Sequence, residues 1–343
     1  MRLPLYLATA LVLFASLSCK NEVNLNAPAR DMLVVYGVLN PDAEFQFIRV
    51  AKVYLPDEDA VKYAGNNDLT LNSSQAEVYL QGVKLRDTFI TRSTGIFTAG
   101  QHLHYLTRSD LPIQAGTQYN LEVKFLANSA ANIKASTTIP DRPAFISPYS
   151  PDYSGGGLNI ANKQVNFENA TKIITEKTKY AAGYELRIYF KYFANGQERN
   201  VTFGPKSFSA NVNCTDPKNV CYGLLKREVL DFIQSTQTEP ASPNYYTVID
   251  TPATVPLPEA YRLNKSNRIS ITAIDSFLYL YLLANNANSS SLATSTLEYT
   301  NIQNGVGVFG SYCETGTYVD FSPCGKYILS FNNAPSPGSY CQK

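Results

Sequence analysis

The chain contains two histidines, His102 and His104, which are separated by one residue. If Leu103 lies on a β-strand, both imidazole rings project from one face of a sheet and could supply two ligands of a metal ion. An exposed polar strand face produces the same spacing, and no third ligand is evident nearby in the sequence. His102 and His104 are therefore the candidate metal ligands, but the sequence gives no reason to predict a bound metal or another cofactor.

Catalysis by a Ser-His-Asp triad or a Cys–His pair would have to use one of these two histidines. Neither a G-x-S-x-G string nor a papain-like cysteine context occurs. The two carboxylates of a glycoside hydrolase come together only in the fold, so a sequence does not identify them. We name no catalytic residue and predict that the protein is not an enzyme.

The six cysteines divide into an N-terminal one, a close pair and a C-terminal group. Cys214 and Cys221 lie seven residues apart in a polar segment, and this spacing predicts a disulfide that closes a small loop. Cys313, Cys324 and Cys341 can form one further pair, for which Cys313 and Cys324 are candidates, and the pairing among the three stays open. No histidine lies near these cysteines and no C-x-x-C pair occurs, which argues against a zinc site.

Two other strings resemble binding motifs. Gly305, Gly307 and Gly310 match the spacing of the dinucleotide-binding fingerprint, but they open no helix and belong to no predicted βαβ unit. We interpret them as a strand that packs closely against another backbone. The acidic and amide residues at 57–59 and 66–68 could bind calcium, but their spacing differs from an EF-hand and favours a solvated loop.

The N-terminal residues indicate export. Arg2 precedes an apolar run at residues 5–17, which is too short to span a bilayer and typical of a signal-peptide core. Ser18 before Cys19 resembles a bacterial lipobox, although Leu17 lies one place later than is usual. We predict a signal peptide at 1–18, lipidation of Cys19 and a tether at 19–30; the alternative is an ordinary cleaved signal.

The charge balance excludes one class of partner. The whole chain has 29 basic and 28 acidic residues, and cleavage before Cys19 removes one basic residue, Arg2, which leaves a net charge of zero. A neutral surface gives no reason to expect nucleic-acid binding.

The pattern from residue 31 predicts a mainly β protein. About seven short strands joined by turns over residues 31–141, without a helical period, are typical of an immunoglobulin-like β-sandwich. Alternation is clearest where Tyr119, Leu121, Val123 and Phe125 share one face, and Gln81-Gly82 has the length of a hairpin turn.

The second half is predicted to be a larger β-rich domain. Proline and glycine concentrate at 142–157, which we interpret as a linker before a domain at 158–343. This domain is expected to contain strands at 184–192 and 268–274 and two short helices. The helices are predicted at 222–235, from helical apolar spacing, and from Ser276 to about residue 287, with an N-cap at Asp275 or Ser276.

The order of these segments resembles a family of uncharacterised Bacteroidetes outer-membrane lipoproteins that are often found near TonB-dependent transporters. The resemblance is carried by Cys19, the strand at 32–40, residues 116–121 and 135–140, the strand and helix at 269–282 and, most closely, residues 301–310. It implies an outer-membrane lipid anchor and a TonB-dependent transporter as partner, but no catalytic or binding residues. Lys20, Asn21 and Glu22 also look like a signal for the cell surface.

The expected function is therefore that of a lipid-anchored, non-enzymatic accessory to a TonB-dependent transporter, which captures or hands over a nutrient. A structural or adhesive surface lipoprotein is the alternative from another class. A hydrolase in the C-terminal domain is the third.

Overall fold

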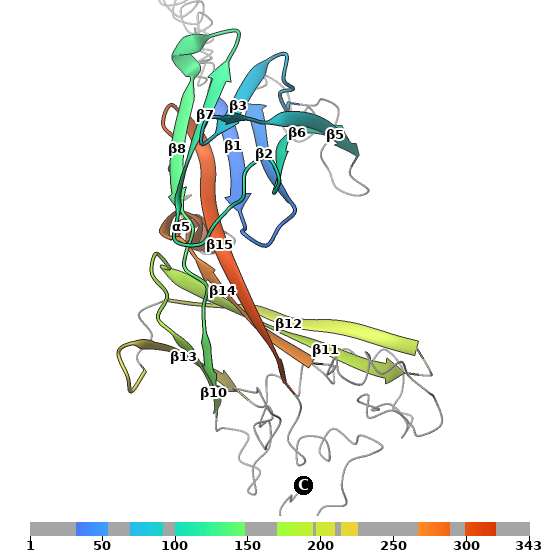
Figure 1. Cartoon of the computed structure of the whole chain (residues 1–343), viewed down its shortest axis with the longest axis vertical. Coiled ribbons are helices and arrows are strands. Elements are labelled where there is room, and N and C mark those ends of the chain that lie inside the picture. The colour runs from blue at the N-terminus through green and yellow to red at the C-terminus, as the bar shows by residue number, and fades with distance from the viewer. Residues whose placement is uncertain are drawn as a thin grey trace, which may run out of the picture.

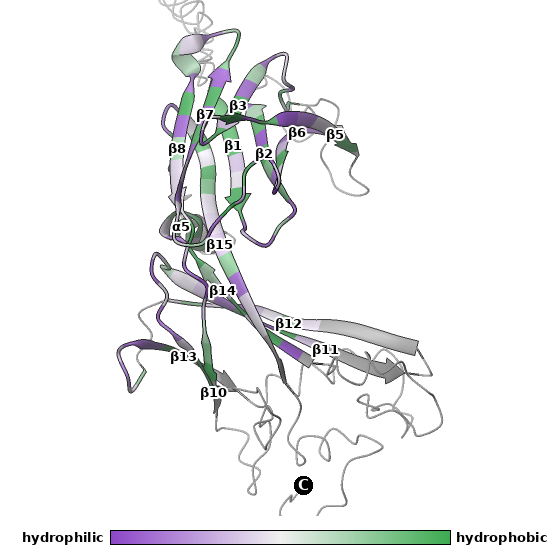
Figure 2. Ribbon diagram, in the orientation of Figure 1, coloured by the Kyte–Doolittle hydropathy of each residue, from purple (hydrophilic) through white to green (hydrophobic). Residues whose placement is uncertain are grey.

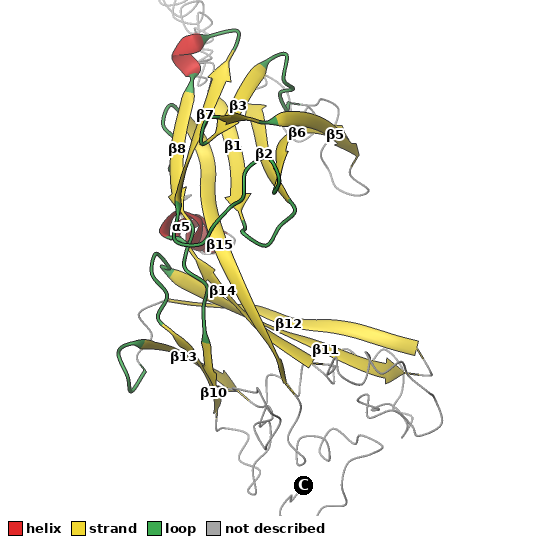
Figure 3. Cartoon of the chain, in the orientation of Figure 1, coloured by secondary structure: helices red, strands yellow, loops and turns green. Residues whose placement is uncertain are grey.

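The computed structural model describes residues 32–53, 69–91, 100–147, 170–194, 197–209, 214–225, 267–288 and 299–319. These residues form three β-sheets and a single α-helix, which confirms the predicted mainly β class (Figures 1 and 3). No helix in these ranges is long and apolar enough to cross a membrane.

The largest sheet has eight strands and runs through the whole described structure (Figure 1). Its order is β12-β11-β14-β15-β1-β2-β6-β5. β1 and β15 are parallel, and the other neighbours are antiparallel. The strands are β1 (Leu33–Leu39), β2 (Phe45–Lys52), β5 (Arg86–Thr91), β6 (Gly100–Thr107), β11 (Gly183–Ala194), β12 (Gln197–Ser209), β14 (Asn267–Ile274) and β15 (Gly305–Val319).

A four-stranded antiparallel sheet, in the order β4-β3-β7-β8, packs on one half of this large sheet. It consists of β3 (Ala76–Leu80), β4 (Val83–Lys84), β7 (Gln118–Phe125) and β8 (Ile133–Thr138). Tyr119, Leu121, Val123 and Phe125 are buried as predicted, and they meet a core that includes Leu33, Val35 and Ile48. Figure 2 shows the alternation of hydrophilic and hydrophobic residues along β7 and β8. Burial of each large aliphatic side chain contributes about 1.5–3 kcal/mol, so this alternation holds the sheets together.

The predicted hairpin turn at Gln81-Gly82 is confirmed. Leu80 pairs with Val83 on either side of it. Gln81 has a φ of 51° and Gly82 a φ of 81°, and positive φ at both central residues is the two-residue turn whose twist matches a hairpin.

β15 joins the N-terminal strands, which the sequence did not predict. It pairs in parallel with β1, and Phe309, Cys313 and Ile302 belong to the same hydrophobic core as Leu33 and Val35. The expectation that residues 31–141 form a self-contained sandwich is therefore wrong, because one of its central strands comes from the far end of the chain.

The glycines of the 305–310 string have structural roles, as predicted. Gly307 has a φ of 112°, and a Cβ there would collide with the backbone carbonyl of Val35 on β1. At Gly310 a Cβ would collide with Leu278 of the helix. Glycine therefore allows β15 to lie against both neighbours.

The third sheet packs on the other half of the large sheet. It contains β9 (Phe145–Ser147), β10 (Ala170–Glu176) and β13 (Asn219–Leu225), in the order β13-β10-β9. Tyr184 of β11 stacks on Phe208 of β12, which in turn contacts Tyr222 of β13, with ring centroids 5.6 and 5.0 Å apart. Aromatic packing thus joins the two layers.

β9 and β13 correct two predictions. Residues 145–147, placed in the linker 142–157, pair with β10. Residues 222–225, placed at the start of a helix, belong to β13 and pair with β10 over its whole length. The apolar spacing that resembled a helix is overridden by this tertiary pairing; the rest of both predicted segments lies outside the described residues.

Helix α5 (Ser276–Asn288) confirms the second helix prediction. The carboxylate of Asp275 accepts a hydrogen bond from the backbone N–H of Leu278 at 2.8 Å, which is the expected N-cap. The helix packs on β15 at the waist of the structure (Figure 1).

Candidate functional site

The two histidines lie on β6, so the predicted strand is confirmed and both rings are on one face. His104 is fully buried, and its Nε2 lies 2.9 Å from the carbonyl oxygen of Leu71. A carbonyl oxygen can only accept a hydrogen bond, so Nε2 is the donor and carries the proton. Burial lowers the pKa of His104, and a neutral ring fits this role.

The described surroundings of the histidines contain no cluster of metal ligands. His102 Nδ1 lies 3.7 Å from the carboxylate of Asp87, and its ring contacts Phe89 edge to face. Within the ranges that the structure describes, no group of three or more His, Cys, Asp or Glu residues is placed to hold a metal ion. The structure thus assigns His104 a structural hydrogen bond to Leu71.

The cysteine predictions have different outcomes. Cys214 and Cys221 form the predicted disulfide, with Cα atoms 5.4 Å apart. Cys313 is a free thiol, fully buried in the hydrophobic core, and this corrects the candidate pairing with Cys324. The physical reason is that the side chain of Cys313 points into the core between the sheets, where the burial also raises the pKa of the thiol. Cys19, Cys324 and Cys341 lie outside the described residues, as do the predicted tether and the acidic and amide residues at 57–59 and 66–68, which were interpreted as a solvated loop.

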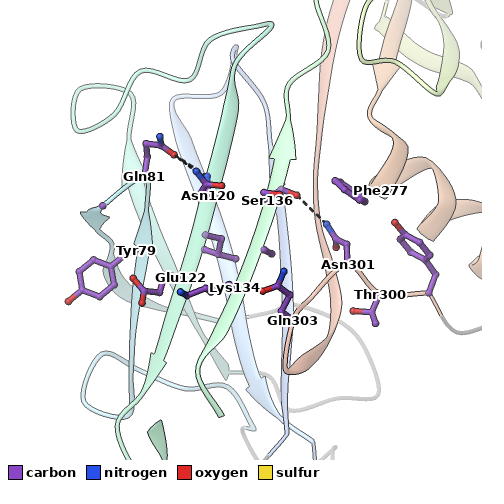
Figure 4. Close-up of a pocket in the computed structure, with 14 residues that line it drawn as sticks. Tyr79, Gln81, Asn120, Glu122, Lys134, Ser136, Phe277, Thr300, Asn301 and Gln303 are labelled. Atoms are coloured by element: carbon purple, nitrogen blue, oxygen red, sulfur yellow. Dashed lines mark hydrogen bonds between the residues drawn. The ribbon is translucent and has the colours of Figure 1, made fainter. Parts of the chain in front are cut away.

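A groove of about 750 Å³ lies on the outer face of the four-stranded sheet (Figure 4). Its floor consists of side chains that alternate with the buried residues of β3, β7 and β8, so they point away from the core. Its wall is made by the segment before β15 and by the first turn of α5. The lining residues are Tyr79, Gln81, Gly82, Asn120, Leu121, Glu122, Lys134, Ala135, Ser136, Phe277, Tyr299, Thr300, Asn301 and Gln303.

Strand register arranges the polar floor in two rows. In the first row Glu122 lies directly opposite Tyr79 on one side and Lys134 on the other. Gln303 continues this row, because it forms an isolated bridge with Lys134 and its N–H donates to the Lys134 carbonyl at 2.9 Å. The row therefore presents a phenol ring, a carboxylate, an ammonium group and an amide in sequence across the sheet.

The second row consists of Gln81, Asn120, Ser136 and Asn301. The Asn120 backbone N–H donates to the side-chain oxygen of Gln81 at 3.1 Å, and the Asn120 amide nitrogen lies 3.4 Å from the same oxygen. At the other end, the Asn301 side chain donates to the carbonyl oxygens of Phe309 at 2.7 Å and of Ser136 at 3.5 Å. It also accepts from the Phe309 N–H at 3.0 Å. Asn301 thereby fixes the wall of the groove to β15 and to β8.

Aromatic rings stand at both ends of the groove. Tyr79 lies on the β3 side and Phe277 on the α5 side (Figure 4). Tyr299 also lines the groove. Lys124 lies over the Tyr79 ring, 4.6 Å from its centroid, and the Tyr79 hydroxyl donates to Glu77 at 2.9 Å. These contacts hold the Tyr79 ring in place. Burial raises the pKa of Tyr299, so its hydroxyl stays protonated at neutral pH.

The groups in the centre of the floor are free to bind. Across the part of the chain that the structure describes, no hydrogen bond or ion pair engages the side chains of Glu122, Lys134 or Ser136. A carboxylate, an ammonium group, a hydroxyl and several amides can donate to and accept from a ligand that carries many polar groups. The arrangement is therefore suited to recognition of a polar ligand, with rings that cover its apolar faces.

The sequence did not identify this groove. Asn120, Glu122 and Lys124 alternate with the strand residues that were predicted to share one face, but that alternation does not distinguish a binding floor from an ordinary solvent-facing surface. Residues 301–310 were noted only because they carry the family resemblance. The available signal was the cluster of three amide residues, Asn301, Gln303 and Asn304, immediately before the strand.

Comparisons with known proteins give one result. No curated protein matches the chain. The family model described as Domain of unknown function (DUF4249) matches residues 20–317, a range that contains all the groove-lining residues and most of β15. The chain therefore belongs to this family.

Proposed function

We propose that this protein is a lipid-anchored, non-enzymatic binding protein of the outer membrane, which captures a polar nutrient for a TonB-dependent transporter. The observation that carries the ligand-binding part is the groove, in which Glu122, Lys134 and Ser136 face a large open hollow and have no side-chain partner among the described residues. Pockets usually combine apolar walls with a few polar groups. This floor is mostly polar, which favours a neutral, hydroxyl-rich ligand such as an oligosaccharide.

The anchor and the location are supported by the sequence and by the family resemblance. Cys19 follows a signal-like run, and Lys20, Asn21 and Glu22 resemble a signal for surface display. We propose that Cys19 carries the lipid and that the protein faces outward. The chain is further proposed to be of Bacteroidetes origin, which rests on the resemblance alone.

We also propose that the sandwich is immunoglobulin-like. The orders β1-β2-β6-β5 and β4-β3-β7-β8 support this, since they correspond to strands A-B-E-D and C′-C-F-G of that fold. In such a sandwich the outer faces of the sheets and the end loops are free for recognition. Use of the outer C′-C-F-G face by the groove agrees with this.

An aromatic cluster supports a protein partner. Phe45, Phe47 and Tyr105 form it on the uncovered face of the large sheet, with ring centroids 6.0–6.2 Å apart. Phe45 and Phe47 are 46% and 44% exposed, and exposed apolar clusters often mark interaction sites. Arg86 lies 5.0 Å from the Tyr105 centroid and pairs with Asp110, so the edge of the cluster is charge-balanced and a partner surface of apolar side chains would fit.

Two experiments test the proposal. An array of neutral oligosaccharides should identify ligands, whose affinity should fall at least tenfold in Glu122→Ala and in Ser136→Trp, which fills the floor. Glu44→Ala, which removes an exposed carboxylate outside the groove lining, is the control and should bind normally. Equal affinity of all variants would reject the groove as the binding site.

The second experiment tests the partner. Crosslinking in intact cells followed by purification should recover a TonB-dependent transporter, and Phe47→Asp should reduce the yield. Recovery of no transporter, with the protein still on the cell surface, would favour the structural or adhesive alternative.

A further inference from the structure

A second hollow lies on the opposite side of the large sheet from the smaller sheets. It has a volume of about 240 Å³ and sits where α5 crosses the sheet. Residues from β1, β11, β14, β15 and α5 line it, so it is made only when these elements come together. We call it the helix-side pocket; its lining residues are Val38, Glu185, Arg187, Thr272, Ile274, Leu278, Leu282 and Tyr312.

One polar group in this pocket has no hydrogen-bond partner in the part of the chain that the structure describes. Thr272 is 3% exposed, and its Oγ1 makes no hydrogen bond. Ser270, two residues earlier on the same face of β14, is fully buried and its hydroxyl is likewise unpaired. A buried hydroxyl without a partner costs about 1–3 kcal/mol. The Thr272 oxygen is covered as it stands, and rotation of this side chain toward the pocket lets a ligand bond to it and recover that energy.

The charges in the pocket balance each other. Glu185 is 9% exposed, and its carboxylate accepts from the Arg187 guanidinium at 2.8 Å. Strand register places Glu185 directly opposite Thr272. The pair carries no net charge, so the pocket favours a neutral head group that can both donate to Glu185 and accept from Thr272 or Arg187.

The remaining walls are apolar. Ile274 and Leu278 are buried, and Val38 and Leu282 are half-buried beside them. Asn40 donates to the Tyr312 hydroxyl at 3.1 Å, which fixes the position of that ring. A volume of this size equals about eight waters at 30 Å³ each, which suits a molecule of roughly eight heavy atoms.

We propose that the helix-side pocket binds a small neutral amphiphile with an amide or hydroxyl head and a short aliphatic tail. The head bonds to Thr272 and to the Glu185–Arg187 pair, and the tail packs against Leu278 and Leu282. This site is separate from the groove, so its test does not depend on the proposed function.

Hexanamide is the probe, and hexanoate and hexylamine have the same tail with a charged head. Ligand-detected NMR titration of the purified protein should give saturable binding of hexanamide at or below about 1 mM. Binding of each charged analogue should be at least fivefold weaker. Absence of saturation by hexanamide, or tighter binding of a charged analogue, would overturn the proposal.

Adjacent helix positions supply matched variants. Leu282→Trp fills the pocket and should abolish binding, whereas Leu283→Trp changes a residue that is 45% exposed and outside the lining, and should leave binding unchanged. Thr272→Val should weaken binding about fivefold without lowering the melting temperature, because it removes the unpaired hydroxyl and keeps the shape. Equal binding by Leu282→Trp and wild type would show that the probe binds elsewhere and would contradict the proposal.

Discussion

The hydroxyl of Thr137 on β8 donates a hydrogen bond to the carboxylate of Asp275, the N-cap residue of α5. The same hydroxyl lies 2.9 Å from that of Ser311 on β15, and Ser311 donates to the Thr138 carbonyl at 3.1 Å. These buried bonds connect the four-stranded sheet, the large sheet and the helix at one point. They also fix the first turn of α5, which carries Phe277 of the groove and Leu278 of the helix-side pocket.

The first prediction concerns the pH dependence of this contact. Burial raises the pKa of Asp275, and hydrogen bonds from Thr137 and the Leu278 N–H partly counter the rise. The folded protein thus keeps this proton to a higher pH than the unfolded chain does. The free energy of unfolding should therefore fall as pH rises from about 4 through the raised folded pKa. Asp275→Asn, which keeps a capping side chain, should remove this component from urea-unfolding curves measured across that range.

Thr137→Val tests the same contact from the other side. The variant removes the donor to a buried carboxylate and should cost about 1–3 kcal/mol at pH 7. The loss should be smaller at pH 4, where Asp275 carries its proton and needs less stabilisation. The same loss at both pH values would contradict the assigned role of the hydrogen bond.

A second prediction concerns His104. Burial lowers its pKa, so the unfolded chain binds a proton that the folded protein does not. Titration of this histidine should therefore lower the free energy of unfolding as pH falls from about 6.5 through the lowered folded pKa. It should have no effect on that free energy above this pH range. His104→Gln can still donate to Leu71 but does not titrate. The difference in unfolding free energy between wild type and variant should shrink in acid, and parallel curves would refute this.

A third prediction concerns the disulfide between Cys214 and Cys221. It closes a short loop, so it removes little entropy from the unfolded chain. Replacement of both residues by Ser should reduce the free energy of unfolding by about 2–3 kcal/mol in the loop-entropy model. Mass spectrometry of non-reduced peptides from the wild type checks that the bond is present, and detection of two free thiols would contradict the structure.

The sequence predicts those parts of the fold that depend on local pattern. The alternation of Tyr119, Leu121, Val123 and Phe125, the turn at Gln81-Gly82 and the cap of α5 at Asp275 are each determined within a few residues. The strand 222–225 was missed because its apolar spacing also fits a helix, and pairing with β10 decides the outcome.

Long-range relationships could not be predicted in the same way. Parallel pairing of Val35 with Gly307 leaves no local signal, apart from glycines that permit close approach. The groove floor was equally hidden, because Glu122 and Lys134 become neighbours only through strand register, and Gln303 joins them from the end of the chain.

The last prediction follows from the place of β15 in the N-terminal core. A fragment that ends at Arg142 lacks β15, so β1 loses its partner on one edge and the core loses Phe309, Cys313 and Ile302. Loss of a buried Phe alone costs about 3–5 kcal/mol, a large share of the stability of a small domain. We expect this fragment to melt without cooperativity by circular dichroism.

A second fragment provides the control for that prediction. Residues 299–303 run antiparallel beside β8, so a short Gly-Ser linker can join Ile139 to Tyr299 and restore residues 299–316. This joined fragment should recover a β spectrum and a cooperative melt, because it returns both the partner of β1 and the missing core side chains. If the fragment ending at Arg142 melts as sharply as the joined one, β15 is dispensable and residues 31–141 form a domain by themselves.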